Sequence, residues 1–161
     1  MAAAAQPSNP APAWYEAFPA PKSEAATISR EEVLAMIKAA PVGSSRDFVL
    51  IDLRRNDFEG GTISGSINLP AQSLYPTLPS IYALFKSAGV RKAIFYCGSS
   101  RGRGSRATAW LADHLASVGD ASMQSLALEG GIKGWVAAGA EYVEYVDGYE
   151  AKVWENVESN C

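Results

Sequence analysis

The stretch AIFYCGSSRGR, residues 93–103, decides how the rest of this 161-residue chain is interpreted. Its first four residues are apolar, which is typical of a strand that is buried on both faces. A cysteine, five mostly small residues and Arg103 follow, and the pattern from Ser105 to Val118 predicts a helix that ends at Gly119. The stretch therefore predicts a strand, a loop and a helix, with Cys97 at the carboxyl end of the strand.

Short apolar runs alternate with amphipathic segments in the rest of the chain. Strands are expected at 48–51, 66–69 and 125–128, and helices at 30–40, 80–88, 132–138 and 142–157, the last interrupted near Gly148. Ser29 and Glu32 form a capping box at the start of the first helix. The alternation predicts an α/β fold of three layers, in which helices cover both faces of a central, mostly parallel sheet.

The first 25 residues are rich in Ala and Pro, so we expect a poorly ordered tail over residues 1–25 and a single domain over residues 26–161. Trp14, Tyr15 and Phe18 are the residues of this tail that are able to pack on the domain. In an open parallel sheet, ligands bind beyond the carboxyl ends of the strands. Cys97 is therefore expected at the binding edge.

Composition excludes several classes of protein. The net charge of −3 and the pI near 5.2 argue against a nucleic-acid binder, and no apolar run is long enough to cross a membrane. Two cysteines cannot form a disulfide framework, and a chain with one histidine is poorly suited to a zinc site. We expect no bound metal and no bound cofactor, and a location in the cytoplasm, with the nucleus as an alternative.

The segment from Cys97 to Arg106 has the parts of a cradle for a small oxyanion. A thiol becomes a good nucleophile when a helix N-terminus and nearby arginines favour its thiolate. We expect the glycines to adopt left-handed conformations that turn backbone N–H groups inward, and the planar guanidinium of Arg103 to hold two oxygens. The predicted catalytic residues are Cys97 and Arg103, and the predicted oxyanion-binding residues are Gly98, Ser99, Ser100, Arg101, Gly102, Gly104 and Arg106.

Other polar residues carry weaker expectations. Asp57 and Glu59 follow a strand and are able to supply a proton, but a solvated surface is the favoured interpretation. For Glu129 both a functional role and a solvated surface position stay open. His114 is expected to be structural or solvated. Cys161, the last residue, is a weak candidate to resolve an oxidised Cys97.

Two further segments show what the chain resembles. Residues 51–54 with 58–70, and the stretch LEGGIKGW at 128–135, are similar to the two signatures of the rhodanese fold. In that family the residues at Asp52 and Arg54 have a structural role, and Thr62 stands where histidine is common. Sulfurtransferases of the fold carry a six-residue loop, whereas the M-phase-inducer phosphatases and the eukaryotic arsenate reductases carry seven residues, as in Cys97–Arg103. The resemblance thus implies a nucleophile at Cys97, an oxyanion clamp at Arg103 and a supporting cation at Arg106.

Two departures from the resemblance narrow the expected reaction. Tyr96 replaces the usual histidine before the cysteine, and the loop lacks an acidic residue. Because phosphate ester hydrolysis needs a proton for the leaving group, these departures favour arsenate or a small phosphate ester over a phosphoprotein. An arsenate reductase would take its electrons from a thiol co-substrate such as glutathione, with glutaredoxin as a partner. A sulfurtransferase and a non-catalytic binding module are the alternatives.

Overall fold

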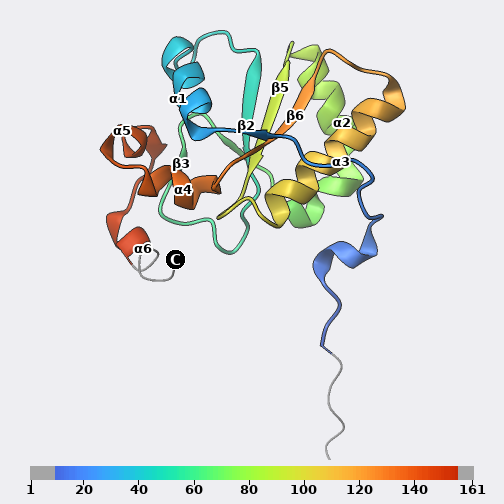
Figure 1. Ribbon diagram of the computed structural model, residues 1–161, viewed down its shortest axis with the longest axis horizontal. Helices are drawn as coiled ribbons and strands as arrows, with labels where there is room; N and C mark the ends of the chain where they lie inside the picture. The colour runs from blue at the N-terminus through green and yellow to red at the C-terminus, as the bar shows by residue number, and fades with distance from the viewer. Residues whose placement is uncertain (1–9, 156–161) are drawn as a thin grey trace, which may run out of the picture.

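Five parallel strands form the centre of the structure, a computed structural model that describes residues 10–155 (Figure 1). The sheet has the order β1-β6-β5-β2-β4, so β5 is the middle strand. All of its neighbouring pairs are parallel, which confirms the predicted α/β class with a parallel sheet. The strands are β1 (Thr27–Ile28), β2 (Phe48–Asp52), β4 (Ile67–Asn68), β5 (Lys92–Tyr96) and β6 (Gln124–Leu128).

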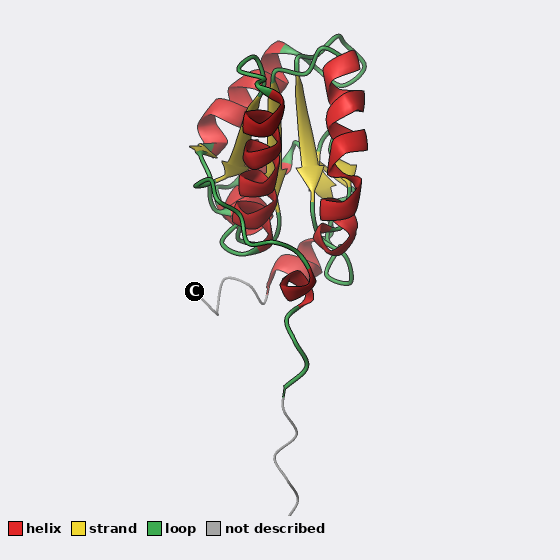
Figure 2. Ribbon diagram, turned by 90° about the vertical axis from the view of Figure 1, so that its right-hand side faces the viewer, coloured by secondary structure: helices red, strands yellow, loops and turns green. Residues whose placement is uncertain are grey.

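Helices cover both faces of the sheet, as the edge-on view in Figure 2 shows. One face carries α2 (Ala71–Ser87) and α3 (Arg103–Val118), and the other carries α1 (Arg30–Ala39) and α4 (Gly131–Ala137). Successive side chains of a strand point to opposite faces. In β5, Ala93 and Phe95 therefore pack towards α2 and α3, and Ile94 and Tyr96 pack on the opposite side. The same alternation places Cys97 on the α2 and α3 side.

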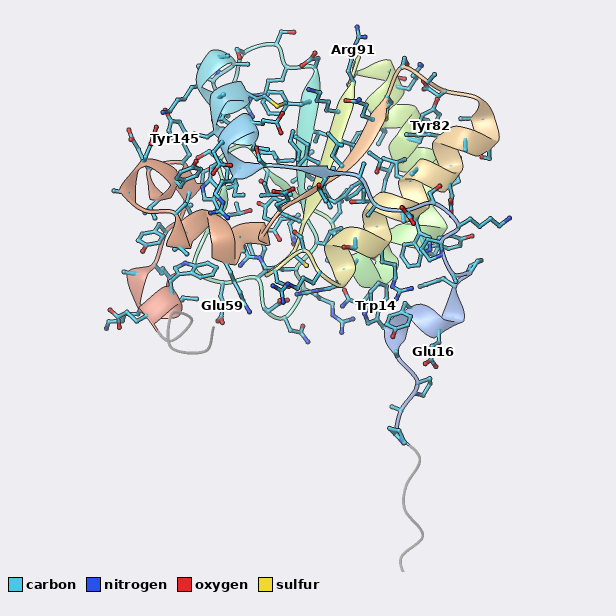
Figure 3. All side chains as sticks on the ribbon, in the orientation of Figure 1. Trp14, Glu16, Glu59, Tyr82, Arg91 and Tyr145 are labelled. Carbon is cyan, nitrogen blue, oxygen red and sulfur yellow. The ribbon has the colours of Figure 1, made fainter. Side chains whose placement is uncertain are left out.

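Local sequence signals account for several boundaries. The capping box at α1 is present: the Ser29 hydroxyl accepts a hydrogen bond from the Glu32 N–H, and the Glu32 carboxylate accepts one from the Ser29 N–H. Helix α3 ends at Gly119, which has a φ of 68° and closes the helix in the left-handed conformation. Side chains fill the space between the layers, and Arg91 lies at the opposite end of the sheet from Trp14 and Glu59 (Figure 3).

The helix expected at 80–88 is longer than predicted. Helix α2 begins at Ala71 and includes Pro76 and Pro79. Proline lacks an N–H and usually interrupts a helix, so the local sequence does not indicate a helix at these positions. Here the buried face of Ala71, Leu74 and Leu78 packs against the sheet, and this burial outweighs the lost backbone hydrogen bonds.

The prediction of a single, interrupted helix at 142–157 is wrong. Within the described part of that range, the chain forms α5 (Ala140–Val143), β7 (Val146–Asp147) and α6 (Ala151–Glu155). Strand β7 pairs antiparallel with β3 (Thr62–Ile63), a two-stranded sheet that the sequence pattern missed. Gly61 is required here because a Cβ on it would lie 2.7 Å from the Asp147 carbonyl oxygen.

The N-terminal segment packs on the domain from Trp14 onward, although the sequence predicted a poorly ordered tail. A short 3₁₀ helix, η1 (Trp14–Ala17), is followed by an extended strap along α3. The Trp110 indole N–H donates to the Pro19 carbonyl, and the N–H groups of Lys22 and Ser23 donate to Asp113. Aromatic and hydrogen-bonding contacts therefore hold this segment, and composition alone did not reveal them. The division at residue 26 stays a prediction.

A buried ion pair fixes the loop that follows β2. Asp52 is fully buried and Arg54 is 2% exposed, with 2.8 Å between Arg54 Nη2 and Asp52 Oδ2. The Arg54 guanidinium also donates to the carbonyls of Glu59 and Gly61, at 2.9 and 2.6 Å. A single side chain thus holds the segment 55–61 against the carboxyl end of the sheet.

Removing the Arg54 guanidinium leaves the Asp52 carboxylate buried without its partner, which costs about 3–5 kcal/mol. We expect Arg54→Ala to lower the free energy of unfolding by that amount, measured by urea denaturation. Arg55→Ala is the matched control, because Arg55 is exposed and a surface change of this kind stays within about 0.5 kcal/mol. Equal stability of the two variants would contradict the role given to Arg54.

Candidate active site

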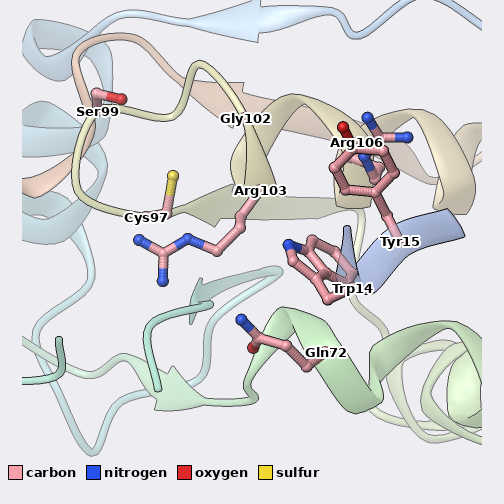
Figure 4. A pocket seen from close by; sticks show the side chains of 8 residues that line it. All are labelled: Trp14, Tyr15, Gln72, Cys97, Ser99, Gly102, Arg103 and Arg106. Atoms are coloured by element: carbon pink, nitrogen blue, oxygen red, sulfur yellow. The ribbon is translucent and has the colours of Figure 1, made fainter. Parts of the chain in front are cut away.

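Cys97 opens the loop between β5 and α3 and faces a cavity of about 500 Å³ (Figure 4). The cysteine loop and the start of α3 line one part of the cavity. Gln72 of α2 and the aromatic side chains of Trp14 and Tyr15 line another. The structure therefore brings together the predicted loop and two segments that the sequence did not assign to it. The residue Cys97 is 3% exposed, so the thiol is reached only through this cavity.

The residue with a left-handed conformation in the loop is Ser100, although the sequence pattern predicted this conformation at the glycines. Its φ of 61° is the only positive φ of a non-glycine residue within 10–155. In this conformation the Ser100 N–H donates to Cys97 Sγ at 3.1 Å, a contact that stabilises negative charge on sulfur. The Ser105 hydroxyl donates to the Ser100 carbonyl at 2.8 Å and holds the turn from the other side. Backbone strain of this kind is concentrated at functional sites.

The glycines of the loop allow neighbouring atoms to approach the backbone closely. A Cβ on Gly104 would lie 2.9 Å from the Ser100 Cβ and 3.7 Å from Cys97 Sγ. Gly98 lies under the Lys133 side chain, and Gly102 precedes the first residue of α3. Within residues 10–155, the N–H groups of Gly98, Ser99 and Gly102 find no hydrogen-bond acceptor. These groups are available to an anion.

Helix α4 fixes the loop from the opposite side. The N–H groups of Ile132 and Lys133 donate to the carbonyls of Cys97 and Gly98, at 3.1 and 3.0 Å. Gly131 allows this approach, because a Cβ on it would lie 2.5 Å from both of those carbonyl oxygens and its φ is 58°. The segment at 128–135 thus acts as a support for the cysteine loop.

The three arginines near the loop have different positions. Arg103 is the first residue of α3, and its side chain extends into the cavity beside Cys97 (Figure 4). Arg106 stacks on the Tyr15 ring, with its Cζ 3.6 Å from the ring centroid. Arg101 is exposed and does not line the cavity. The cavity therefore receives positive charge from Arg103 and Arg106, while the prediction for Arg101 finds no support in its position.

Asp57 forms a two-point ion pair with Arg103, where the sequence favoured a solvated side chain. Arg103 Nη1 and Nη2 donate to Asp57 Oδ1 and Oδ2 at 2.8 and 2.5 Å. These hydrogen bonds lower the pKa of Asp57 to about 2, and they raise the pKa of Arg103. Asp57 is exposed, as expected, but the sequence did not indicate this ion pair, because Asp57 and Arg103 are far apart in sequence and Arg54 determines where the Asp57 loop lies. Glu59 contributes its carbonyl to Arg54 and is exposed.

Tyr96 takes no part in the cavity although it precedes Cys97. Its hydroxyl lies on the other face of the sheet and contacts Thr62 Oγ1 at 2.8 Å and Ser66 Oγ at 2.6 Å. Burial and the negative charge of Asp52 raise the pKa of Tyr96. Thr62 also donates to Asp52, so the hydroxyls of Thr62 and Tyr96 complete a buried polar network.

The remaining candidates lie away from the cysteine loop. His114 packs its ring against Tyr82, and the Glu129 carboxylate accepts a hydrogen bond from Thr27. Trp110 and Trp135 are buried. Cys161 lies outside the described residues. In the part of the chain that the structure describes, no group of three metal-ligating side chains is found, and no helix is long and apolar enough to span a membrane.

A cysteine loop at the carboxyl end of a central parallel strand, closed by a helix N-terminus, defines a class of α/β proteins with a reactive edge. Comparison with protein families shows to which family of that class the chain belongs. The family described as "Rhodanese-like domain" matches residues 29–138, and the chain belongs to this family. A comparison with curated proteins found no match.

Solved structures confirm the fold. Ygr203w, described as a yeast protein tyrosine phosphatase of the Rhodanese family, is 23% identical, with a TM-score of 0.65 over 83% of this chain and 99% of that chain. A second structure of Ygr203w, from Saccharomyces cerevisiae, has the same identity and TM-score over 81% of this chain and 92% of that chain. The As-Sb reductase from Leishmania major is also 23% identical, with a TM-score of 0.59 over 66% of this chain and 73% of that chain. At this identity the likeness shows the fold alone.

Because α4 lies so close to the loop, we expect alanine substitution to affect stability differently at two glycines of this helix. Gly131→Ala forces a Cβ against two carbonyl oxygens and puts a non-glycine residue at positive φ, which costs about 1–3 kcal/mol. Gly134→Ala makes only ordinary contacts, of 3.7 Å or more, and gains helix propensity. Urea denaturation should show a loss for Gly131→Ala and no loss for Gly134→Ala. A similar effect of both would contradict the contact.

The Asp57–Arg103 pair predicts a pH dependence of stability. The folded pKa of Asp57, about 2, lies below the usual value near 3.9, so its stabilising contribution is present above pH ~4 and is lost as the pH falls to about 2. We expect the stability difference between wild type and Asp57→Asn to shrink over that interval in urea denaturation. Because Asp57 is half exposed, the effect is small. Glu59→Gln is the control, and a difference that stays constant between pH 4 and 2 would contradict the ion pair.

Proposed function

We propose that this protein is a cysteine-dependent enzyme that acts on a tetrahedral oxyanion, and that hydrolysis of a phosphate monoester is the reaction best supported. The observation that carries the proposal is the Asp57 carboxylate, paired with the Arg103 guanidinium beside Cys97. In the sequence, the absence of an acid in the loop favoured arsenate or a small phosphate ester over a phosphoprotein. Asp57 supplies an acid from another segment of the chain.

Arg103 and the loop would bind the substrate. A phosphate group matches the planar fork of Arg103 as a carboxylate does, so phosphate oxygens would replace Asp57 in the same two hydrogen bonds. The unpaired N–H groups of Gly98, Ser99 and Gly102 provide further donors. Once released, Asp57 loses the main cause of its low pKa, and the dianion beside it raises that pKa further. Substrate binding thus converts Asp57 from a carboxylate into a proton donor.

The chemistry would then take two steps. Cys97 Sγ attacks phosphorus and forms an S–P bond as the P–O bond to the leaving group breaks. The leaving oxygen takes the proton from Asp57. Water next attacks phosphorus, its proton goes to the Asp57 carboxylate, and the electron pair of the S–P bond returns to the Cys97 thiolate. A reactive thiol requires a reducing compartment, so we place this activity in the cytoplasm or the nucleus.

Arsenate reduction is the second candidate. The loop itself holds no carboxylate, and attack of Cys97 on arsenate releases hydroxide or water, which needs less proton donation. Two electrons would come from thiols: glutathione would attack the cysteine–arsenic adduct, arsenic(V) would become arsenic(III), and a disulfide would form. Glutaredoxin would reduce that disulfide.

Parallel assays separate these functions. Purified protein receives p-nitrophenyl phosphate or an alkyl phosphate, arsenate with glutathione and glutaredoxin, or thiosulfate with cyanide. We expect phosphate release that falls to background in Cys97→Ser. Asp57→Asn should lower kcat about 100-fold for the alkyl ester and far less for p-nitrophenyl phosphate, whose leaving group needs no acid. KM should fall for both esters, because Arg103 is no longer occupied. Glu59→Gln is the control.

Each alternative has its own result. Arsenate reduction without ester hydrolysis would select the second candidate. Sulfur transfer in the absence of both would make the protein a sulfurtransferase. If no substrate reacts and Cys97→Ser behaves as wild type, the protein is a binding module. An equal loss for both esters in Asp57→Asn would remove Asp57 as the acid.

A further inference from the structure

The cavity is larger than an oxyanion requires. Four oxygen atoms around one centre occupy about as much space as four water molecules, roughly 120 Å³ at ~30 Å³ each. The cavity measures about 500 Å³, and it continues from the cysteine loop towards η1 and α2. A second group of the substrate therefore has space next to the oxyanion.

Trp14 offers an unused hydrogen-bond donor in that space. Of the four tryptophans in the chain, Trp110, Trp135 and Trp154 donate their indole N–H to a backbone carbonyl. Within residues 10–155, the Trp14 indole N–H has no acceptor, and Figure 4 shows its nitrogen on the cavity side. Trp14 is only partly buried, so this N–H is available to a ligand in the cavity.

Gln72 lies across the cavity from Trp14 and is also unpaired. Figure 4 shows its amide nitrogen on the cavity side, whereas its Oε1 atom is buried and has no hydrogen-bond partner in the described residues. The amide N–H groups are hydrogen-bond donors that a ligand in the cavity is able to reach. The amide and the indole together provide N–H donors at one end of the cavity.

The Trp14 side chain is held in a fixed position. Its ring packs edge-on against Trp110, with 6.0 Å between centroids, and Trp110 is tied to Pro19. The neighbouring Tyr15 ring supports the Arg106 guanidinium. A rigid aromatic surface of this kind binds planar groups at little cost in conformational entropy.

We propose that Trp14 and Gln72 form a second subsite of the active site, which binds a planar group with hydrogen-bonding atoms that the substrate carries beside its oxyanion. This inference rests on the proposed function and extends it to the substrate class: an ester of a planar, amide-bearing or similarly polar aromatic group, not a free inorganic oxyanion. The N-terminal strap thereby becomes a specificity element of the enzyme.

The test measures binding to the full chain with Cys97→Ser, which cannot turn over the ligand. Isothermal titration calorimetry compares 4-carbamoylphenyl phosphate with ethyl phosphate, which has the oxyanion but no planar group. We expect the first to bind at least tenfold more tightly. Adding Trp14→Leu or Gln72→Leu should remove most of that advantage and leave the Kd for ethyl phosphate within twofold. Tyr149→Leu, an exposed aromatic position that does not line the cavity, is the matched control.

The results distinguish the inference from the proposed function. Equal binding of the two ligands, or an advantage that survives both substitutions, would overturn the subsite while the oxyanion site stands. Failure of both ligands to bind would overturn both. Thermal melting of each variant identifies unfolding, and if Trp14→Leu unfolds, Trp14→Phe keeps the ring and removes only the indole N–H. That variant should still lose part of the advantage.

Discussion

The candidate active site depends on the buried guanidinium of Arg54. Its charge is balanced by Asp52 at the end of β2, and its remaining donors reach the carbonyls of Glu59 and Gly61. Because a buried charge tolerates little displacement, the loop between these residues has one position. Asp57 lies in that loop and therefore meets Arg103 across the carboxyl edge of the sheet. A structural ion pair thus determines where the Asp57 carboxylate lies.

The cysteine loop is held in a similar way by groups outside it. Ser100 is kept at positive φ by the Ser105 hydroxyl, and α4 binds the carbonyls at the beginning of the loop. Gly104 and Gly131 are necessary because backbone and side chains approach too closely for a Cβ. The loop is therefore formed before a ligand arrives, which reduces the free-energy cost of ordering it on binding.

Much of the fold follows from local sequence signals. The apolar run before Cys97, the capping box at Ser29 and the glycine at 119 each predict an element that the structure contains. Residues 71–79 of helix α2 and the pairing of β3 with β7 escaped prediction because tertiary contacts decide them. Packing overrides two prolines in α2, and β7 is only two residues long.

The candidate site is predictable only in part for the same reason. Cys97 and Arg103 belong to one continuous segment, and spacing alone is enough to associate them. Gln72 and Trp14 reach the cavity, and Asp57 reaches Arg103, from three other segments, and no local pattern connects them with the loop. The strap that carries Trp14 was masked by its Ala/Pro-rich composition, which is typical of disorder. Aromatic residues within such a segment are the signal that it packs on a domain.

The contact between α4 and the loop also orients two peptide dipoles at the beginning of the loop. In a trans peptide unit the C=O and the N–H point in opposite directions. The carbonyls of Cys97 and Gly98 are turned to the N-terminus of α4, so the N–H groups of the next residues, Gly98 and Ser99, are turned away from it. The positive ends of two peptide dipoles are thereby oriented by a Gly-Gly pair some thirty residues downstream, at positions 130 and 131. These two N–H groups thus add positive partial charge to the loop that does not depend on any arginine.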